Sequence, residues 1–286
     1  MSLERIGFAF NPTNPQAVGL RDRAVAWCAD RGIEHWTTQA EDLDGLLREL
    51  RATDALVVLG GDGTLLRAAR AVVEIDVPIL GVNVGKVGFL SKIEADALET
   101  TLGQIVAEDF GIDERMALAG TILPGGGEDH DGRHDLQRFV ALNDVVVARG
   151  ALARVCHLDV AIDGTHVATF VADGLVVASP TGSTGYSFSA GGPILDPVSR
   201  NIVVTPIAAY LAAIRSIVVS PRQTVRCTVV AAYEALVSID GREDRPLTVG
   251  DVVEIRAVNR PIRFVEPRGA ASFWDLLRHK VQLLPR

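Results

Sequence analysis

The sequence has little of what marks secreted or membrane-spanning proteins. Its three cysteines, Cys28, Cys156 and Cys227, lie far apart without CxxC spacing, which argues against a disulfide framework and a cysteine-rich zinc site. Three buried thiols in a reducing compartment are expected instead. No apolar run is long enough to span a bilayer, and the N-terminus lacks the basic-then-apolar pattern of a signal peptide. We therefore expect a cytoplasmic protein.

Positive charge is also scarce. The chain has 28 lysines and arginines against 36 aspartates and glutamates, a formal net charge of -8. Proteins that bind nucleic acids or acidic membranes usually carry a basic face, so neither is an expected partner. An anionic substrate would have to be held by local arginines, lysines and backbone N–H groups. The remaining composition, 48% hydrophobic and 22% charged over 286 residues, is typical of a globular protein with a large core.

The first part of the chain alternates strand and helix patterns. Alternation of this kind predicts a parallel sheet with helices on its faces, and ligands in such sheets bind beyond the carboxyl ends of the strands. The predicted strands are residues 5–10, 34–38, 55–59 and 77–82; the predicted helices are residues 15–31, 41–50, 65–71 and 95–109.

The pattern changes near Gly111. From residue 116 to 265, short apolar runs separated by turn residues predict a β-rich domain, with Asp163 and Gly164 as a hairpin turn. The polar, glycine-rich residues 124–132 are expected to be a solvated hairpin tip rather than a metal loop. A final helix is predicted at residues 272–278, opened by a capping-box-like pair, Ser272 and Asp275.

The most informative motif is Gly-Gly-Asp-Gly-Thr at residues 60–64, between an apolar strand and a helix. Backbone N–H groups and the positive end of a helix can hold phosphate there, and glycines let the backbone approach an anion closely. A purely structural interpretation remains open: a tight turn with positive φ, in which Asp62 caps the helix. The motif lacks the ending of a Walker A loop and is not GxGxxG.

Three further segments carry polar groups that need partners. Asn143 and Asp144 interrupt an apolar run, either on a solvated edge strand or aimed at a ligand's hydroxyls or base edge. Residues 173–193 are dense in glycines and hydroxyls, as in functional loops. Asp240 and Gly241 read by themselves as a hairpin turn.

With these segments the chain resembles the NAD kinase family. The resemblance rests on residues 60–64, the Gly-Lys-Val-Gly-Phe-Leu loop at 85–90, Asn143-Asp144, residues 181–193 and Asp240-Gly241, in the family's order. The first motif is shared with diacylglycerol, sphingosine and phosphofructokinases; the Asn-acidic pair and Ser-Pro-Thr-Gly-Ser-Thr at 179–184 select NAD kinase. Gly185 departs from the family, which often has alanine there.

The resemblance implies transfer of a phosphoryl group from ATP, or polyphosphate, to the 2′-hydroxyl of the adenosine ribose of NAD, giving NADP, with Mg²⁺ as cofactor. It implies an α/β phosphate-donor domain at residues 1–112 with a returning segment at 268–286, a β-rich dinucleotide-binding domain at 113–267, and a homodimer or homotetramer. No protein ligand of Mg²⁺ is assigned.

The same resemblance, taken with the motif chemistry, gives the expected site residues. Asp62 is expected to be the catalytic base. The phosphate donor is expected to contact Gly60, Gly61, Gly63, Thr64 and Arg67. NAD is expected to contact Asp62, Gly63, Phe89, Asn143, Asp144, Arg154, Asp173, Thr181, Thr184, Gly185, Tyr186, Ser189 and Arg242.

Two other functions remain open at this point. A lipid or sugar kinase would share the residues 60–64 motif, although the chain shows no basic membrane-binding helix. A non-catalytic NAD(P)-binding sensor would share the fold, although Asp62 and both glycine loops are intact.

Overall fold

The computed structural model describes residues 3–85, 88–125, 137–151, 154–211 and 213–282. The chain forms two compact units: residues 1–114 with 262–286, and residues 115–261. Residues 86–87 of the second glycine loop and most of the predicted hairpin tip lie outside the described residues. The α/β and β-rich classes expected for the two parts of the chain are confirmed.

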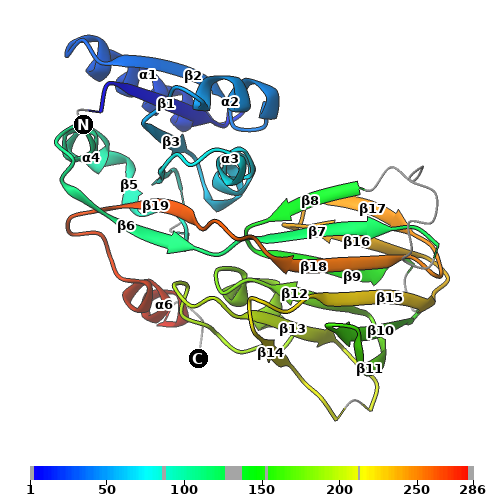
Figure 1. The fold of residues 1–286 in the computed structure, drawn as a ribbon. Coiled ribbons are helices and arrows are strands. Elements are labelled where there is room, and N and C mark those ends of the chain that lie inside the picture. The colour runs from blue at the N-terminus through cyan, green and yellow to red at the C-terminus, as the bar shows by residue number, and fades with distance from the viewer. Residues whose placement is uncertain (1–2, 86–87, 126–136, 152–153, 212, 283–286) are drawn as a thin grey trace. The chain divides into compact units, whose positions relative to one another are not determined.

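The first unit is built on a seven-stranded sheet in the order β2-β1-β3-β4-β19-β6, with β5 beside β4 (Figure 1). The pairs β1–β2, β1–β3, β3–β4, β4–β5 and β4–β19 are parallel. The strands are β1 (Arg5–Phe10), β2 (Glu34–Gln39), β3 (Ala55–Leu59), β4 (Ile79–Asn83), β5 (Ile93–Glu94), β6 (Phe110–Arg115) and β19 (Ile262–Pro267).

Local sequence explains where the helices of this unit begin. Asn14 caps α1 by accepting from the N–H of Gln16, and Asp42 caps α2 by accepting from the N–H of Gly45. Ser272 caps α6 by accepting from the N–H of Asp275, as predicted. The helices are α1 (Pro15–Ala29), α2 (Leu43–Leu50), α3 (Asp62–Glu74), α4 (Leu98–Val106) and α6 (Phe273–Gln282).

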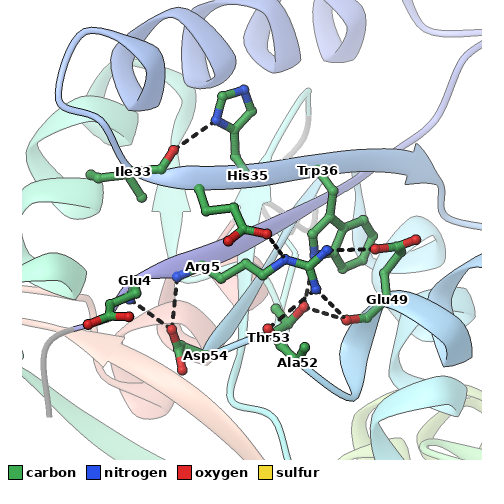
Figure 2. Close-up of polar contacts among 10 residues, drawn as sticks. Glu4, Arg5, Ile33, His35, Trp36, Glu49, Ala52, Thr53 and Asp54 are labelled. Carbon is green, nitrogen blue, oxygen red and sulfur yellow. Dashed lines mark hydrogen bonds and ion pairs between the residues drawn. The ribbon is translucent and has the colours of Figure 1, made fainter.

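Arg5 anchors the start of β1 to its surroundings (Figure 2). Its guanidinium pairs with Glu49 at 2.7 Å and with Glu34 at 2.7 Å, joining β1 to α2 and β2. The carboxylate of Asp54, just before β3, accepts from the backbone N–H groups of Glu4 and Arg5 at 2.8 Å. These contacts fix the amino ends of the strands, opposite the ends from which both glycine loops leave.

The second unit contains two six-stranded antiparallel sheets, in the orders β11-β10-β15-β18-β7-β8 and β14-β13-β12-β9-β16-β17. Residues from both sheets, such as Leu158 and Val147, form one buried apolar core between them. The strands are β7 (Leu118–Leu123), β8 (Gln137–Ala141), β9 (Asp144–Arg149), β10 (Cys156–Ile162), β11 (Thr165–Ala172), β12 (Gly174–Ala178), β13 (Ile202–Ile207), β14 (Ile217–Val219), β15 (Val225–Ala231), β16 (Ala235–Ile239), β17 (Glu243–Leu247) and β18 (Val252–Ala257).

Two hairpins of this unit turn on an Asp-Gly pair in the left-handed region. Asp163 and Gly164, with φ of 50° and 79°, join β10 to β11, as predicted. Asp240 and Gly241, with φ of 51° and 66°, join β16 to β17. The two turns are locally alike, but Asp240 has a second role described below.

Some sequence-based boundaries differ from the structure. The predicted helix 95–109 is a 3₁₀ turn, η1 (Ala95–Ala97), followed by α4, which ends at Val106 because the chain turns at Glu108 (φ 54°) into β6. Residues 262–267, assigned from sequence to the β-rich domain, form β19 of the first unit because they pair with β4.

The expected packing of the final helix and the expected buried thiols are confirmed. Helix α6 packs on the first unit, where its Phe273 ring lies 5.8 Å from the ring of Phe89. Cys28, Cys156 and Cys227 are free and buried. Among the described residues, no helix has the length and apolar character needed to cross a membrane.

Candidate active site

The Gly-Gly-Asp-Gly-Thr motif forms the junction between β3 and α3. Gly61 is the N-cap residue, with φ of -85°, so Asp62 is not the cap but the first residue of the helix. The turn residues do not have positive φ, contrary to one interpretation of the sequence. A Cβ at Gly60 would lie 2.5 Å from Oγ1 of the buried Thr64, whereas Gly61 faces open space. Close packing therefore requires glycine at residue 60, and the partly exposed amino end of α3 can accept an anion.

The carboxylate of Asp62 is held by the second glycine loop. Its Oδ2 accepts from the N–H of Phe89 at 2.8 Å, and its Oδ1 accepts from the N–H groups of Leu90 at 3.2 Å and Ser91 at 3.4 Å. A Cβ at Gly88 would lie 1.8 Å from that Oδ1. Because β3 and β4 pair in parallel, both loops leave the same edge of the sheet, and the structure brings Asp62 and Phe89 together.

Arg67, expected at the phosphate donor, lies on α3 with its side chain partly exposed. Its guanidinium pairs with Glu41 at 3.2 Å. Because the carboxylate of Glu41 already binds this guanidinium, the contact of Arg67 with the phosphate donor stays a prediction.

In the second unit, Asn143 and Asp144 lie where β9 begins. The carboxylate of Asp240 accepts from the N–H groups of Leu142 at 3.0 Å, Asn143 at 2.8 Å and Asp144 at 3.2 Å. The N–H of Asp240 in turn donates to the carbonyl of Asp144. The hairpin aspartate therefore sets the backbone from which both polar side chains project. Asp144 is buried, with 6% of its surface exposed.

Burial dominates the electrostatics of Asp144. Burial, and secondarily the negative charge of Asp240, raises the pKa of Asp144 to about 7. The carboxyl group thus titrates near neutral pH. Among the described residues, none forms a hydrogen bond with the side-chain amide of Asn143 or the side-chain carboxyl of Asp144, so the fold itself uses neither group.

The hydroxyl-rich segment packs directly against this backbone. The N–H of Ser179 donates to the carbonyl of Asn143 at 2.8 Å, and a Cβ at Gly182 would lie 2.1 Å from that oxygen. The buried Thr181 hydroxyl finds no partner among the described residues. A Cβ at Gly185 would lie 3.8 Å from Oδ2 of Asp144. The structure therefore brings Thr181 and Gly185 together with Asn143 and Asp144.

This segment is more ordered than its composition indicates. It contains a 3₁₀ turn, η2 (Gly182–Thr184), and a short helix, α5 (Tyr186–Ser189). Tyr186 is 47% exposed, as a side chain that stacks on a base would be. The hydroxyls of Thr184 and Ser189 point to local carbonyls, those of Thr181 at 3.3 Å and Gly185 at 3.5 Å.

Three other residues expected to contact NAD have different surroundings. Asp173 is bound through both oxygens by Arg149, at 2.8 and 3.3 Å, a partner that sequence analysis missed. The guanidinium of Arg154 lies 5.8 Å from the ring centre of Tyr233. Arg242 is exposed in the β16–β17 turn.

Sequence analysis gave no role to two residues that support the site. It named Asp240 and Gly241 in the family resemblance, but by themselves they have the same hairpin pattern as Asp163 and Gly164. It did not single out Lys280, whose Nζ lies 3.9 Å from the centre of the Phe89 ring. The signal in the sequence was the seven-residue spacing of Lys280 from Phe273, which places both residues on one face of a helix.

Comparisons with known proteins show the family to which the chain belongs. Residues 6–110 match the ATP-NAD kinase N-terminal domain, and residues 142–267 match the ATP-NAD kinase C-terminal domain. An NAD kinase from Dehalococcoides mccartyi is 38% identical over 279 residues, 98% of this chain and 96% of that protein. An NAD kinase from Gemmatimonas aurantiaca is 41% identical over 231 residues, 80% of this chain and 77% of that protein.

Two solved structures share the fold. Yeast NADH kinase, complexed with NADH, has a TM-score of 0.83 at 23% identity and covers 99% of this chain and 88% of its own. An NAD kinase from Archaeoglobus fulgidus, in complex with ATP, has a TM-score of 0.77 at 24% identity and covers 98% of this chain and 100% of its own. The resemblance stated from the motifs is confirmed: the chain belongs to the NAD kinase family, whose reaction is the phosphorylation of NAD with ATP.

Proposed function

We propose that Asp62 is the general base that takes the proton from the 2′-hydroxyl of the adenosine ribose of NAD while that oxygen attacks the terminal phosphoryl group of ATP. The observation that carries this role is the orientation of its carboxylate by the N–H groups of Phe89, Leu90 and Ser91. Oδ2 accepts only one of these bonds and retains a further lone pair for a substrate proton. Asp62 is only partly buried, so a hydroxyl can reach it.

The proton balance of this reaction is simple. The ribose O–H bond breaks, its proton moves to Asp62, the new O–P bond forms, and ADP leaves with the electrons of the broken P–O bond. A ribose hydroxyl is a weak nucleophile at neutral pH, and general-base help of this kind is worth about 10²–10⁴-fold. Positioning and charge neutralisation must supply most of the remaining acceleration.

The donor phosphates are assigned to the amino end of α3. Gly61 faces open space there, and a helix amino end is an anion site. We assign the donor contacts to Gly60, Gly61, Gly63, Thr64 and Arg67.

The acceptor nucleoside is assigned to the second unit. Asn143 and Asp144 would hold ribose hydroxyls or the base edge, with the unpartnered Thr181 hydroxyl beside them. The other residues that we assign to NAD are Asp62, Gly63, Phe89, Arg154, Asp173, Thr184, Gly185, Tyr186, Ser189 and Arg242.

Mg²⁺ is the proposed cofactor, held mainly by the donor phosphates. It binds oxygen ligands, keeps several waters and commonly uses few protein carboxylates in kinases. Within the described residues no three His, Cys, Asp or Glu side chains form a metal-binding group. The bound ion would neutralise charge on the transferring phosphoryl group. We also propose that the enzyme accepts polyphosphate as a donor. We propose further that it forms a homodimer or homotetramer and is located in the cytoplasm.

The test uses NAD and an analogue that lacks only the 2′-hydroxyl of the adenosine ribose, each with Mg²⁺ and ATP. The expected result is NADP from NAD, and binding of the analogue without phosphorylation. Phosphorylation of the analogue would overturn the assigned acceptor. Replacing ATP by polyphosphate tests the second donor.

A second measurement separates the acceptor residues from the donor residues. Asn143→Ala is expected to raise KM for NAD by about 10-fold, the loss of one to two hydrogen bonds, while KM for ATP stays unchanged. A change confined to KM for ATP would place Asn143 at the donor instead.

A further inference from the structure

Helix α6 places a lysine beside the loop that holds Asp62. Lys280 lies in the last turn of α6, and its Nζ is 3.9 Å from the centre of the Phe89 ring. The same ring lies 5.8 Å from that of Phe273 in the first turn of the helix. Residues from the first and the last turn of α6 therefore both contact the ring of Phe89. An ammonium over an aromatic face is attracted by the negative electrostatic potential of that face.

Phe89 connects this ammonium to the candidate base. Its backbone N–H donates to Oδ2 of Asp62 at 2.8 Å, while the face of its ring contacts the ammonium of Lys280. Burial lowers the pKa of Lys280, and the negative charge of Asp62 raises it in opposition. Lys280 and Asp62 thus interact electrostatically across one residue. The position in the last turn of a helix also favours a positive charge.

The charges of Lys280 and Asp62 are opposite and attract each other. This attraction draws the ammonium and the carboxylate toward the Phe89 loop that lies between them. Two other cations close in sequence are already paired: Arg67 with Glu41 at 3.2 Å and Lys92 with Asp113 at 3.1 Å.

We propose that Lys280 is a positioning residue for phosphoryl transfer: its ammonium holds the Phe89 loop, whose backbone N–H orients the carboxylate of Asp62 toward the ribose hydroxyl. Lys280 forms no bond to substrate and gives up no proton. The role rests on the proposed function of Asp62.

The test compares three variants. Lys280→Met keeps the apolar stem on the Phe89 ring and removes the charge; Lys280→Arg keeps the charge; Arg278→Met removes a charge that pairs with Asp275 at 3.2 Å on the exposed side of the same helix. Lys280→Met is expected to lower kcat about 10-fold or more, below the roughly 10²–10³-fold loss typical of a buried stabilising donor because Lys280 is partly exposed. KM for NAD and Tm are expected to stay near the wild-type values. Lys280→Arg is expected to keep most of kcat, and Arg278→Met all of it.

Three results would overturn the proposal. The first is a wild-type kcat in Lys280→Met. The second is a kcat in Lys280→Arg as low as that of Lys280→Met. The third is a loss of kcat in Arg278→Met equal to that in Lys280→Met. If Lys280→Met is poorly folded, the comparison is made in Lys280→Ala with added ethylamine, which should restore part of kcat. Absence of that rescue contradicts a role of the charge.

A double-mutant cycle separates this proposal from the assignment of Asp62. If Lys280 acts through Asp62, Lys280→Met should cost nothing further in the Asp62→Asn background. A full multiplicative loss in the double variant would show that Lys280 acts independently of Asp62. Normal turnover in Asp62→Asn alone would instead refute the base.

Discussion

The carboxylate of Asp240 accepts the backbone N–H of Asn143 at 2.8 Å, across 97 residues of sequence. The same carboxylate accepts from Leu142 and Asp144, so one side chain fixes three consecutive amides at the start of β9. Asp240 therefore holds in place the backbone that presents the proposed acceptor residues.

Asp240→Ala is expected to destabilise the fold by about 2–4 kcal/mol, because three backbone donors lose a charged acceptor. It should also raise KM for NAD, since Asn143 and Asp144 lose their fixed backbone. Thermal unfolding and steady-state kinetics check both effects.

Asp163 offers the matched control for this prediction. It has the same residue type and left-handed φ in the β10–β11 turn, and its Oδ1 accepts from the N–H of Thr224. Asp163→Ala should cost less stability and leave KM for NAD unchanged. Equal KM effects in the two variants would mean that Asp240 acts only through general stability.

Asp144 should give the protein a pH dependence near neutrality. Its pKa is raised in the folded state to about 7 from 3.8, so between these values the folded protein holds a proton that the unfolded chain has lost. This contribution to stability is fully present below about pH 4 and is lost as pH rises through about 7.

The same titration should appear in substrate binding. If the ionised carboxylate accepts from ribose, KM for NAD should fall as pH rises through about 7. Asp144→Asn should remove this step from the pH profile of KM. A step that persists unchanged in the variant would assign it to another group.

Gly88→Ala should impair catalysis by displacing Asp62. The new Cβ would lie 1.8 Å from Oδ1 of Asp62, so the carboxylate must move. A shift of about 1 Å at a reacting group can cost roughly 10²-fold in rate, which is the expected loss in kcat.

Gly103→Ala is the control for this substitution. Gly103 lies inside α4 with open space around its Cβ position, so alanine should leave kcat unchanged and add up to about 1 kcal/mol of stability. A wild-type kcat in Gly88→Ala would show that the Asp62 position is not critical.

Arg149 and Asp173 should act as a pair. Because Arg149 binds both oxygens of Asp173, Arg149→Met and Asp173→Asn should each raise KM for NAD, and the double variant should be no worse than either. An effect of Asp173→Asn that survives unchanged on removal of Arg149 would instead indicate a direct contact of Asp173 with NAD.

Sequence patterns predicted the parts of the site that depend on local structure. The junction at residues 60–64 and the loop after β4 could be placed at one sheet edge, because parallel strands end at the same edge. The hydrogen bonds from Phe89, Leu90 and Ser91 to Asp62 could not, since they depend on the path of the loop around the carboxylate.

The missed features depend on tertiary contacts. Asp240 and Asp163 have the same local signature, and only strand register places Asp240 beside the start of β9. Residues 262–267 form an apolar run like those of the sandwich, and their pairing with β4 decides their unit. Arg149 and Asp173 are 24 residues apart, so no local pattern joins them.

The most direct test of the account is the turnover of Asp62→Asn. Asparagine keeps the size of the side chain but replaces one of the two oxygens that accept from Phe89, Leu90 and Ser91, so Tm should fall. NAD binding should change little while the carboxylate base is lost. We expect kcat for NADP formation to fall by about 10²–10⁴-fold, with the dissociation constant for NAD near the wild-type value. Near-normal turnover in this variant would contradict the assignment of Asp62 as the base.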